Sequence, residues 1–177
     1  LTIIVTLPTV EYKVLLTNGN EILIDNPSDF PERQKIDKVF EPFIEATIIV
    51  PKTYLGQVLS LCQNRRGEQK ELSYLDENRV VLHYLMPLSE VVMDFYDKLK
   101  SVSSGYASFD YEFFGYRDSD LVKMNILLNG KPVDALALIV HRDKAYYVGR
   151  DLVDKLRKII PRQLFEVAIQ ASIGSKV

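Results

Sequence analysis

Residues 45–67 read EATIIVPKTYLGQVLSLCQNRRG and contain the clearest change of pattern in the chain. Residues 46–50 are an apolar run of strand length, and Pro51 follows at a position where proline favours the start of a helix. The expected helix has an apolar stripe at Tyr54, Leu55, Val58, Leu59 and Cys62. Gly67 predicts its end, because glycine readily takes the left-handed capping conformation, and Arg65 and Arg66 suit the negative end of a helix.

The residues that follow complete a regular order of elements. Two strands are expected at residues 71–75 and 80–86, and then a second helix with Ser89 as its candidate N-cap. A last strand is expected at residues 107–113. The order β-α-β-β-α-β predicts an α+β fold with a ferredoxin-like domain over residues 41–116.

An Asn-Gly pair on each side of this domain predicts a β-hairpin. Asn18-Gly19 joins the expected strands 10–16 and 21–25, and Asn129-Gly130 joins strands 122–128 and 133–140. Residues 26–42 are rich in proline and charge and predict a connector. Residues 1–40 are therefore interpreted as the hairpin end of a preceding domain with its linker.

Residues 117–177 are expected to begin a further α+β domain. Besides the hairpin, it has a helical pattern at residues 149–160 and a strand pattern at residues 164–169. The chain starts without a Met and ends after Gly174 without a closing element, so we expect it to be cut from a longer chain at both ends.

The charge is distributed unevenly along the chain. The net charge is −2, but residues 117–177 hold 11 Lys and Arg against 7 Asp and Glu, a balance of +4. A cationic C-terminal part suits contact with phosphate, although short segments often deviate by a few charges without a function.

Sites for nucleotides and metals are missing from the sequence. It contains no GxxxxGK[ST] phosphate loop and no GxGxxG turn, and its one cysteine, Cys62, and two distant histidines, His83 and His141, form no ligand cluster. We therefore expect no catalytic site, no metal site and no small-molecule substrate in this chain.

The remaining chemical signal is basic and partly aromatic. Arg and Lys neutralise phosphate, and Tyr and Arg planes stack on exposed bases. For Arg65 and Arg66, and for the run His141, Arg142 and Lys144, the sequence favours RNA contact and simple solubility equally. The RNA-binding candidates are Arg65, Arg66, His141, Arg142, Lys144, Arg150, Arg162 and Lys176.

Short motifs in the central domain resemble the domain that elongation factor G and its relatives carry after their decoding-arm domain, domain V. They are Glu41-Pro42, Tyr54-Leu55-Gly56, Asn64-Arg65-Arg66-Gly67, Pro87-Leu88-Ser89-Glu90 and Ser103-Ser104-Gly105-Tyr106-Ala107-Ser108. Together they are typical of translational GTPases as a class.

Motifs in the last third resemble the special C-terminal domain of the LepA family, the back-translocases also called elongation factor 4. They lie at residues 121–124, 126–130, 133–137, 141–145 and 160–171. The short connector before the central domain also fits LepA, which lacks the decoding-arm domain of elongation factor G.

The resemblance implies a parent protein that hydrolyses GTP with Mg²⁺ on the ribosome and promotes back-translocation or remodelling of ribosomes. It implies that the C-terminal domain reaches ribosomal RNA and tRNA, that the GTPase residues lie outside this chain, and that the protein is a cytoplasmic monomer. It leaves open contact with the inner face of the cell membrane and, in a eukaryote, an organellar location.

The alternative function is an autonomous small enzyme with a ferredoxin-like active site. It requires convergent titratable groups in a cleft, and a pocket lined by several of Asp134, His141 and Asp143 would favour it.

Overall fold

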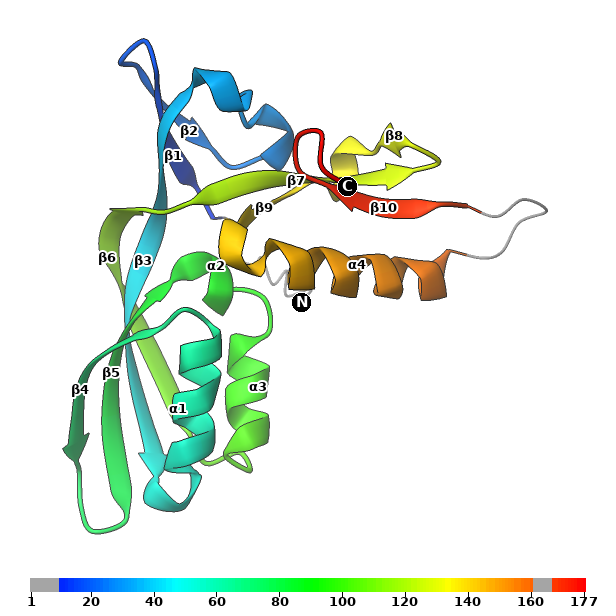
Figure 1. Cartoon of the computed structure of the whole chain (residues 1–177). Coiled ribbons are helices and arrows are strands. Elements are labelled where there is room, and N and C mark those ends of the chain that lie inside the picture. Colours follow the sequence, from blue (N-terminus) through cyan, green and yellow to red (C-terminus); the bar gives the residue numbers. More distant parts are fainter. Residues whose placement is uncertain (1–9, 161–166) are drawn as a thin grey trace, which may run out of the picture. The chain divides into compact units, whose positions relative to one another are not determined.

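The computed structural model describes residues 10–160 and 167–177 (Figure 1). The chain divides into two compact units. Unit 1 consists of Leu1–Glu11 and Phe40–Arg117, and unit 2 consists of Tyr12–Val39 and Asp118–Val177.

Unit 1 has four strands and two main helices in the order that the sequence predicts. The strands are β3 (Ile36–Pro51, whose first residues belong to unit 2), β4 (Glu68–Tyr74), β5 (Arg79–Pro87) and β6 (Ser108–Asp118). The helices are α1 (Leu55–Asn64) and α3 (Phe95–Val102), with the short α2 (Leu88–Val91) before α3. The strands lie in the order β4-β5-β3-β6, and β5 is antiparallel to both of its neighbours. The α+β class and the ferredoxin-like arrangement are confirmed.

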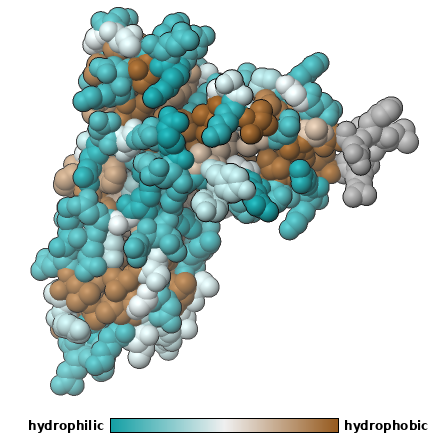
Figure 2. All heavy atoms as spheres, viewed as in Figure 1, coloured by the Kyte–Doolittle hydropathy of each residue, from teal (hydrophilic) through white to brown (hydrophobic). Residues whose placement is uncertain are grey.

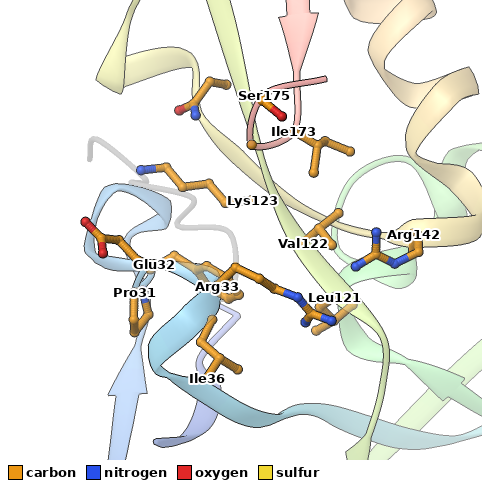
Figure 3. A pocket seen from close by; sticks show the side chains of 13 residues that line it. Pro31, Glu32, Arg33, Ile36, Leu121, Val122, Lys123, Arg142, Ile173 and Ser175 are labelled. Atoms are coloured by element: carbon orange, nitrogen blue, oxygen red, sulfur yellow. The ribbon is translucent and has the colours of Figure 1, made fainter. Parts of the chain in front are cut away.

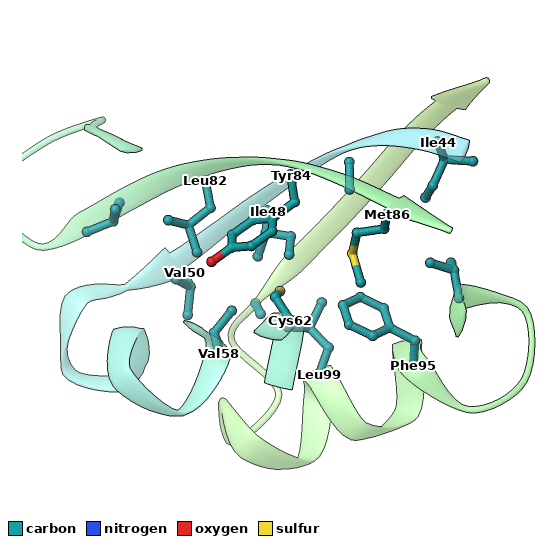
Figure 4. Packing of buried hydrophobic residues seen from close by; sticks show 14 residues of the cluster. Ile44, Ile48, Val50, Val58, Cys62, Leu82, Tyr84, Met86, Phe95 and Leu99 are labelled. Carbon is teal, nitrogen blue, oxygen red and sulfur yellow. The ribbon is translucent and has the colours of Figure 1, made fainter. Parts of the chain in front are cut away.

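Alternate side chains of the strands form the core of unit 1. In β3, every second side chain from Ile44 to Val50 is buried, and in β5 the same holds from Val80 to Met86. These side chains face the apolar stripes of α1 and α3, which lie together on one face of the sheet (Figure 4). Cys62 is completely buried in this cluster, as its place on the stripe predicts.

Two details of unit 1, and the connector in unit 2, differ from the prediction. A 3₁₀ turn, η3 (Lys52–Tyr54), precedes α1. The second helix is divided into α2 and α3, and Pro87, not Ser89, occupies the N-cap of α2 without a side-chain cap. The connector is more structured than expected, because it contains the 3₁₀ turns η1 (Pro27–Asp29) and η2 (Arg33–Lys35) and the start of β3.

Gly67 ends α1 for a different reason from the one predicted. Arg66, with φ of 56°, takes the left-handed conformation. The Gly67 N–H donates to the Cys62 carbonyl oxygen at 2.9 Å, and a Cβ at position 67 would lie 2.6 Å from that oxygen and 3.0 Å from Tyr84 Cδ1. The position therefore requires glycine because of a close approach of the backbone.

Unit 2 is built around the long strand β7 (Leu121–Leu128). It pairs antiparallel with β8 (Lys131–Pro132), β9 (Leu138–His141) and β10 (Ile169–Ser172). Helix α4 (Ala145–Ile159) covers β7 through Gly149, since a Cβ there would lie 3.1 Å from both Met124 Cε and Ala171 Cβ. Unit 2 also contains the hairpin β1 (Tyr12–Leu16) and β2 (Glu21–Ile24).

Both Asn-Gly hairpins are confirmed, with Gly19 and the pair Asn129 and Gly130 at positive φ. The second arm of the C-terminal hairpin is not one strand, because η4 (Asp134–Leu136) separates β8 from β9. Helix α4 starts at Ala145, four residues earlier than expected, after the 3₁₀ turn η5 (Arg142–Lys144). Of the strand predicted at residues 164–169, residues 164–166 lie outside the described residues, and β10 begins only at Ile169.

The surface of the described residues is mixed. Figure 2 shows brown apolar areas among teal hydrophilic residues on the visible face. None of the helices in the described part of the chain has the length and apolar character needed to cross a membrane.

Candidate nucleic-acid interface

Arg66 lies in a network of carboxylates inside unit 1. Its Nη1 and Nη2 donate to Glu41 Oε1 and Oε2 at 2.6 and 3.0 Å, and its Nε donates to Glu90 Oε1 at 3.2 Å. Burial by itself would lower the pKa of Arg66, but the hydrogen bonds and charges of Glu41 and Glu90 outweigh it and raise the pKa. The positive charge of the Arg66 guanidinium is therefore paired with carboxylates of its own unit.

Arg65 is bound in a similar way. Its Nη2 donates to Asp94 Oδ1 at 2.8 Å and its Nη1 donates to the backbone oxygen of Glu90 at 3.2 Å. Burial opposes ionisation of Asp94, but pairing with Arg65 lowers the pKa of this carboxyl. Both arginines fasten the end of α1 to the α2–α3 segment, which gives them a structural role, and RNA contact by them stays a prediction.

The segment that joins β9 to α4 holds three of the predicted residues. The His141 Nδ1 accepts from the Asp143 N–H at 3.2 Å, so His141 serves as the N-cap of η5, and only 18% of its side chain is exposed. Arg142 donates from its backbone N–H to the Asp120 carbonyl oxygen and from Nε to Asp120 Oδ2, both at 2.9 Å. Lys144 is half-buried at the end of η5.

The first turns of α4 carry exposed aromatic rings beside a cation. Tyr146 and Tyr147 are 67% and 73% exposed, and their rings lie edge to face with centroids 5.5 Å apart. Arg150 Nη1 donates to the Tyr146 hydroxyl oxygen at 3.3 Å. An exposed guanidinium beside aromatic faces combines the two groups that bind phosphate and stack on bases.

A pocket of about 520 Å³ lies within unit 2 (Figure 3). Arg142 lines it together with two cations that the sequence did not single out, Arg33 of η2 and Lys123 of β7. Arg33 shares the connector with Lys35 and Lys38 among several acidic residues, and Lys123 lies between the buried Val122 and Met124, so neither stood out as a binding candidate in the sequence. Only the pairing of these segments in three dimensions identifies them.

The other candidates lie apart from this pocket. Lys176 is exposed in the C-terminal turn, where its backbone pairs with Ile173. Arg162 lies outside the described residues. The described members of the predicted set therefore divide into four groups: Arg65 and Arg66 in unit 1, Arg142 at the pocket, His141, Lys144 and Arg150 around η5 and the start of α4, and Lys176 in the C-terminal turn.

The geometry expected of an autonomous enzyme is not found in the described residues. Asp134, His141 and Asp143 do not line the pocket. Within residues 10–160 and 167–177, no three His, Cys, Asp or Glu side chains are grouped so that they could hold a metal ion.

Comparison with known proteins gives two family matches and many relatives. The elongation factor G C-terminus family matches residues 38–127, and the GTP-binding protein LepA C-terminus family matches residues 128–177. Elongation factor 4 of Bacillus cytotoxicus is 58% identical over 175 residues, which are 99% of this chain and 29% of that protein. Elongation factor 4 of Geobacillus thermodenitrificans and that of Chlorobium limicola are each 57% identical with the same coverage.

The chain thus spans 29% of the length of these relatives. The two family matches follow one another along the chain, and the identity extends over almost all of it. This chain belongs to the LepA (elongation factor 4) family.

Proposed function

We propose that this chain is the ribosome-docking part of a translational GTPase that promotes back-translocation or remodelling of ribosomes during protein synthesis. In this proposal residues 41–116 correspond to domain V of elongation factor G, residues 117–177 begin the LepA-specific domain, and residues 1–40 end the preceding domain. GTP and Mg²⁺ act in the part of the parent protein that lies outside this chain.

The proposed partners are ribosomal RNA and tRNA, which a cytoplasmic monomer would meet on the ribosome. The observation that supports this proposal is the combination of Arg142, Arg150 and the exposed Tyr146 and Tyr147 in unit 2. Such a surface offers positive charge for phosphates and ring faces for unpaired bases. Peripheral contact with the membrane would use the same charges on anionic headgroups.

Co-sedimentation of the 177-residue chain with purified ribosomes tests this function. Replacing Arg142, Lys144 and Arg150 by Ala should weaken binding and reduce its dependence on salt, by roughly 0.7 to 0.9 in the log-log slope for each lost phosphate contact. The matched control replaces Lys52, Lys70 and Arg79, three exposed cations of unit 1.

The control variant should bind as the unchanged chain does. If the two triple variants bind equally well and keep the same salt slope, the proposed RNA surface is wrong. Adding vesicles of anionic phospholipid as a competitor separates the two partners, because a chain that prefers membranes leaves the ribosome pellet, whereas a chain that docks on ribosomes stays in it.

A further inference from the structure

The pocket of unit 2 brings together four segments of the sequence. Its walls come from residues 30–36 of the connector, residues 121–125 of β7, Arg142 of η5 and the C-terminal turn at residues 173–175 (Figure 3). A volume of about 520 Å³ is in the range of pockets that hold a ligand of nucleotide size.

The charges at this pocket favour an anion. Arg33, Lys123 and Arg142 line it, against the single carboxylate of Glu32. Arg142 is paired with Asp120 through Nε, whereas within the described part of the chain neither Arg33 nor Lys123 makes an ion pair. Figure 3 shows the guanidinium groups of Arg33 and Arg142 pointing towards one another. Like charges that share a cavity repel unless an anion lies between them.

Neutral groups in the pocket complete the chemistry for a phosphate ester. Asn125 and the exposed Ser175 supply hydrogen-bond donors, and Gly174 leaves the turn without a side chain at that point. Ile36 and Leu121 form an apolar wall. Such a wall packs more favourably against the carbon atoms of a sugar ring than against water. Positive charge, neutral donors and an apolar wall together match a sugar-phosphate strand.

We propose that this pocket binds the phosphodiester backbone of an RNA strand, with Arg33, Lys123 and Arg142 neutralising its phosphates. The inference rests on the proposed function and deepens it, because it places a contact site for RNA away from the outer face of α4. It also gives the connector a part in binding, since Arg33 belongs to η2.

Fluorescence anisotropy with a labelled uridine oligonucleotide tests the site in the 177-residue chain. The double variant Arg33→Ala and Lys123→Ala should weaken binding and lower the log-log salt slope by about 1.4, the share of two phosphate contacts on single-stranded RNA. The matched control is Lys35→Ala and Lys131→Ala, which removes two exposed cations from η2 and β8 that do not line the pocket. The control should keep the slope.

A second measurement does not depend on removing charge. Cys62 is buried, so Ser175→Cys introduces a single accessible thiol at the pocket. The uridine oligonucleotide should slow modification of this thiol by a maleimide, whereas poly-glutamate at equal charge concentration should not. A Tyr147→Cys variant on the outer face of α4 reports protection elsewhere in unit 2.

Each result decides between the alternatives. RNA binding that is equal in the double variant and its control, with no protection of the thiol introduced at position 175, overturns the pocket and leaves ribosome docking intact. Equal protection by poly-glutamate or by inorganic phosphate overturns the assignment to an RNA backbone. A chain that binds neither the oligonucleotide nor ribosomes overturns the proposed function and this inference together.

Discussion

Arg66 binds both carboxylate oxygens of Glu41, at 2.6 and 3.0 Å, and the Glu41 side chain is completely buried. The pair joins the end of α1 to β3 across 25 positions of sequence. A buried carboxylate without a partner is costly, so this contact decides how well the helical layer of unit 1 is held to its sheet.

Arg66→Ala should lower the free energy of unfolding by about 3–5 kcal/mol, because it removes the guanidinium that binds both oxygens of the buried Glu41 carboxylate. Urea unfolding followed by circular dichroism measures the change. The matched control is Arg65→Ala, which leaves the half-exposed Asp94 with Lys98 as a partner and should cost only about 1 kcal/mol. Equal losses in the two variants would contradict this account of Glu41.

Cys62 should make the free energy of unfolding depend on pH in the alkaline range. Burial raises the pKa of its thiol from 9.0 to about 12, and burial, followed by the charge of Cys62, raises the pKa of Tyr84 to about 12. Above pH 9 the unfolded thiol loses its proton while the folded thiol keeps it, so the unfolded chain binds fewer protons. The free energy of unfolding should therefore fall as the pH rises from 9 towards 12, by up to about 1.4 kcal/mol per pH unit for each such group.

Urea unfolding at several pH values measures this slope. Cys62→Ala removes the titration of the thiol, so the slope just above pH 9 should become shallower and only the share of Tyr84 should remain at higher pH. The comparison uses slopes, because the variant also leaves a small cavity. An unchanged slope would show that the thiol does not titrate in this window.

Gly67→Ala should destabilise unit 1 by about 1–3 kcal/mol, since the added methyl group meets the Cys62 carbonyl oxygen and forces the backbone to move. Gly56→Ala is the matched control within α1, where a Cβ meets no atom within 4 Å. That variant should stabilise by about 0.5–1 kcal/mol, as expected for a glycine replaced inside a helix. Thermal unfolding of both variants checks the opposite signs.

The fold of unit 1 could be predicted because its signals are local. The alternation in β3 and β5 and the stripe of α1 each arise within a few residues of sequence, as does the Asn129-Gly130 turn of unit 2. The choice between Arg66 and Gly67 for the left-handed position could not be predicted, because the close approach of Tyr84 excludes a side chain at Gly67 only in the folded chain.

The candidate site could be predicted only in part, because the sequence around a basic residue does not show which distant residue it contacts in the fold. Arg66 and Arg142 look alike in sequence, but Arg66 meets a buried carboxylate 25 positions away and Arg142 lines an open pocket. Arg33 and Lys123 gain significance only when η2 and β7 lie at the same cavity. Clustering along the sequence therefore does not show which cations are paired within the fold and which line the pocket.

Tyr146→Ala with Tyr147→Ala should weaken binding of a uridine oligonucleotide by about 1–3 kcal/mol for each base that stacks on a ring, and should leave the salt slope unchanged. The rings are 67% and 73% exposed, so their removal disturbs little packing. Arg150→Ala is the informative comparison, because losing its charge should reduce the slope by roughly 0.7. Anisotropy titrations at several salt concentrations separate the two effects. If the tyrosine variant binds with full affinity, the rings do not stack on bases and α4 contributes to RNA binding only through its charges.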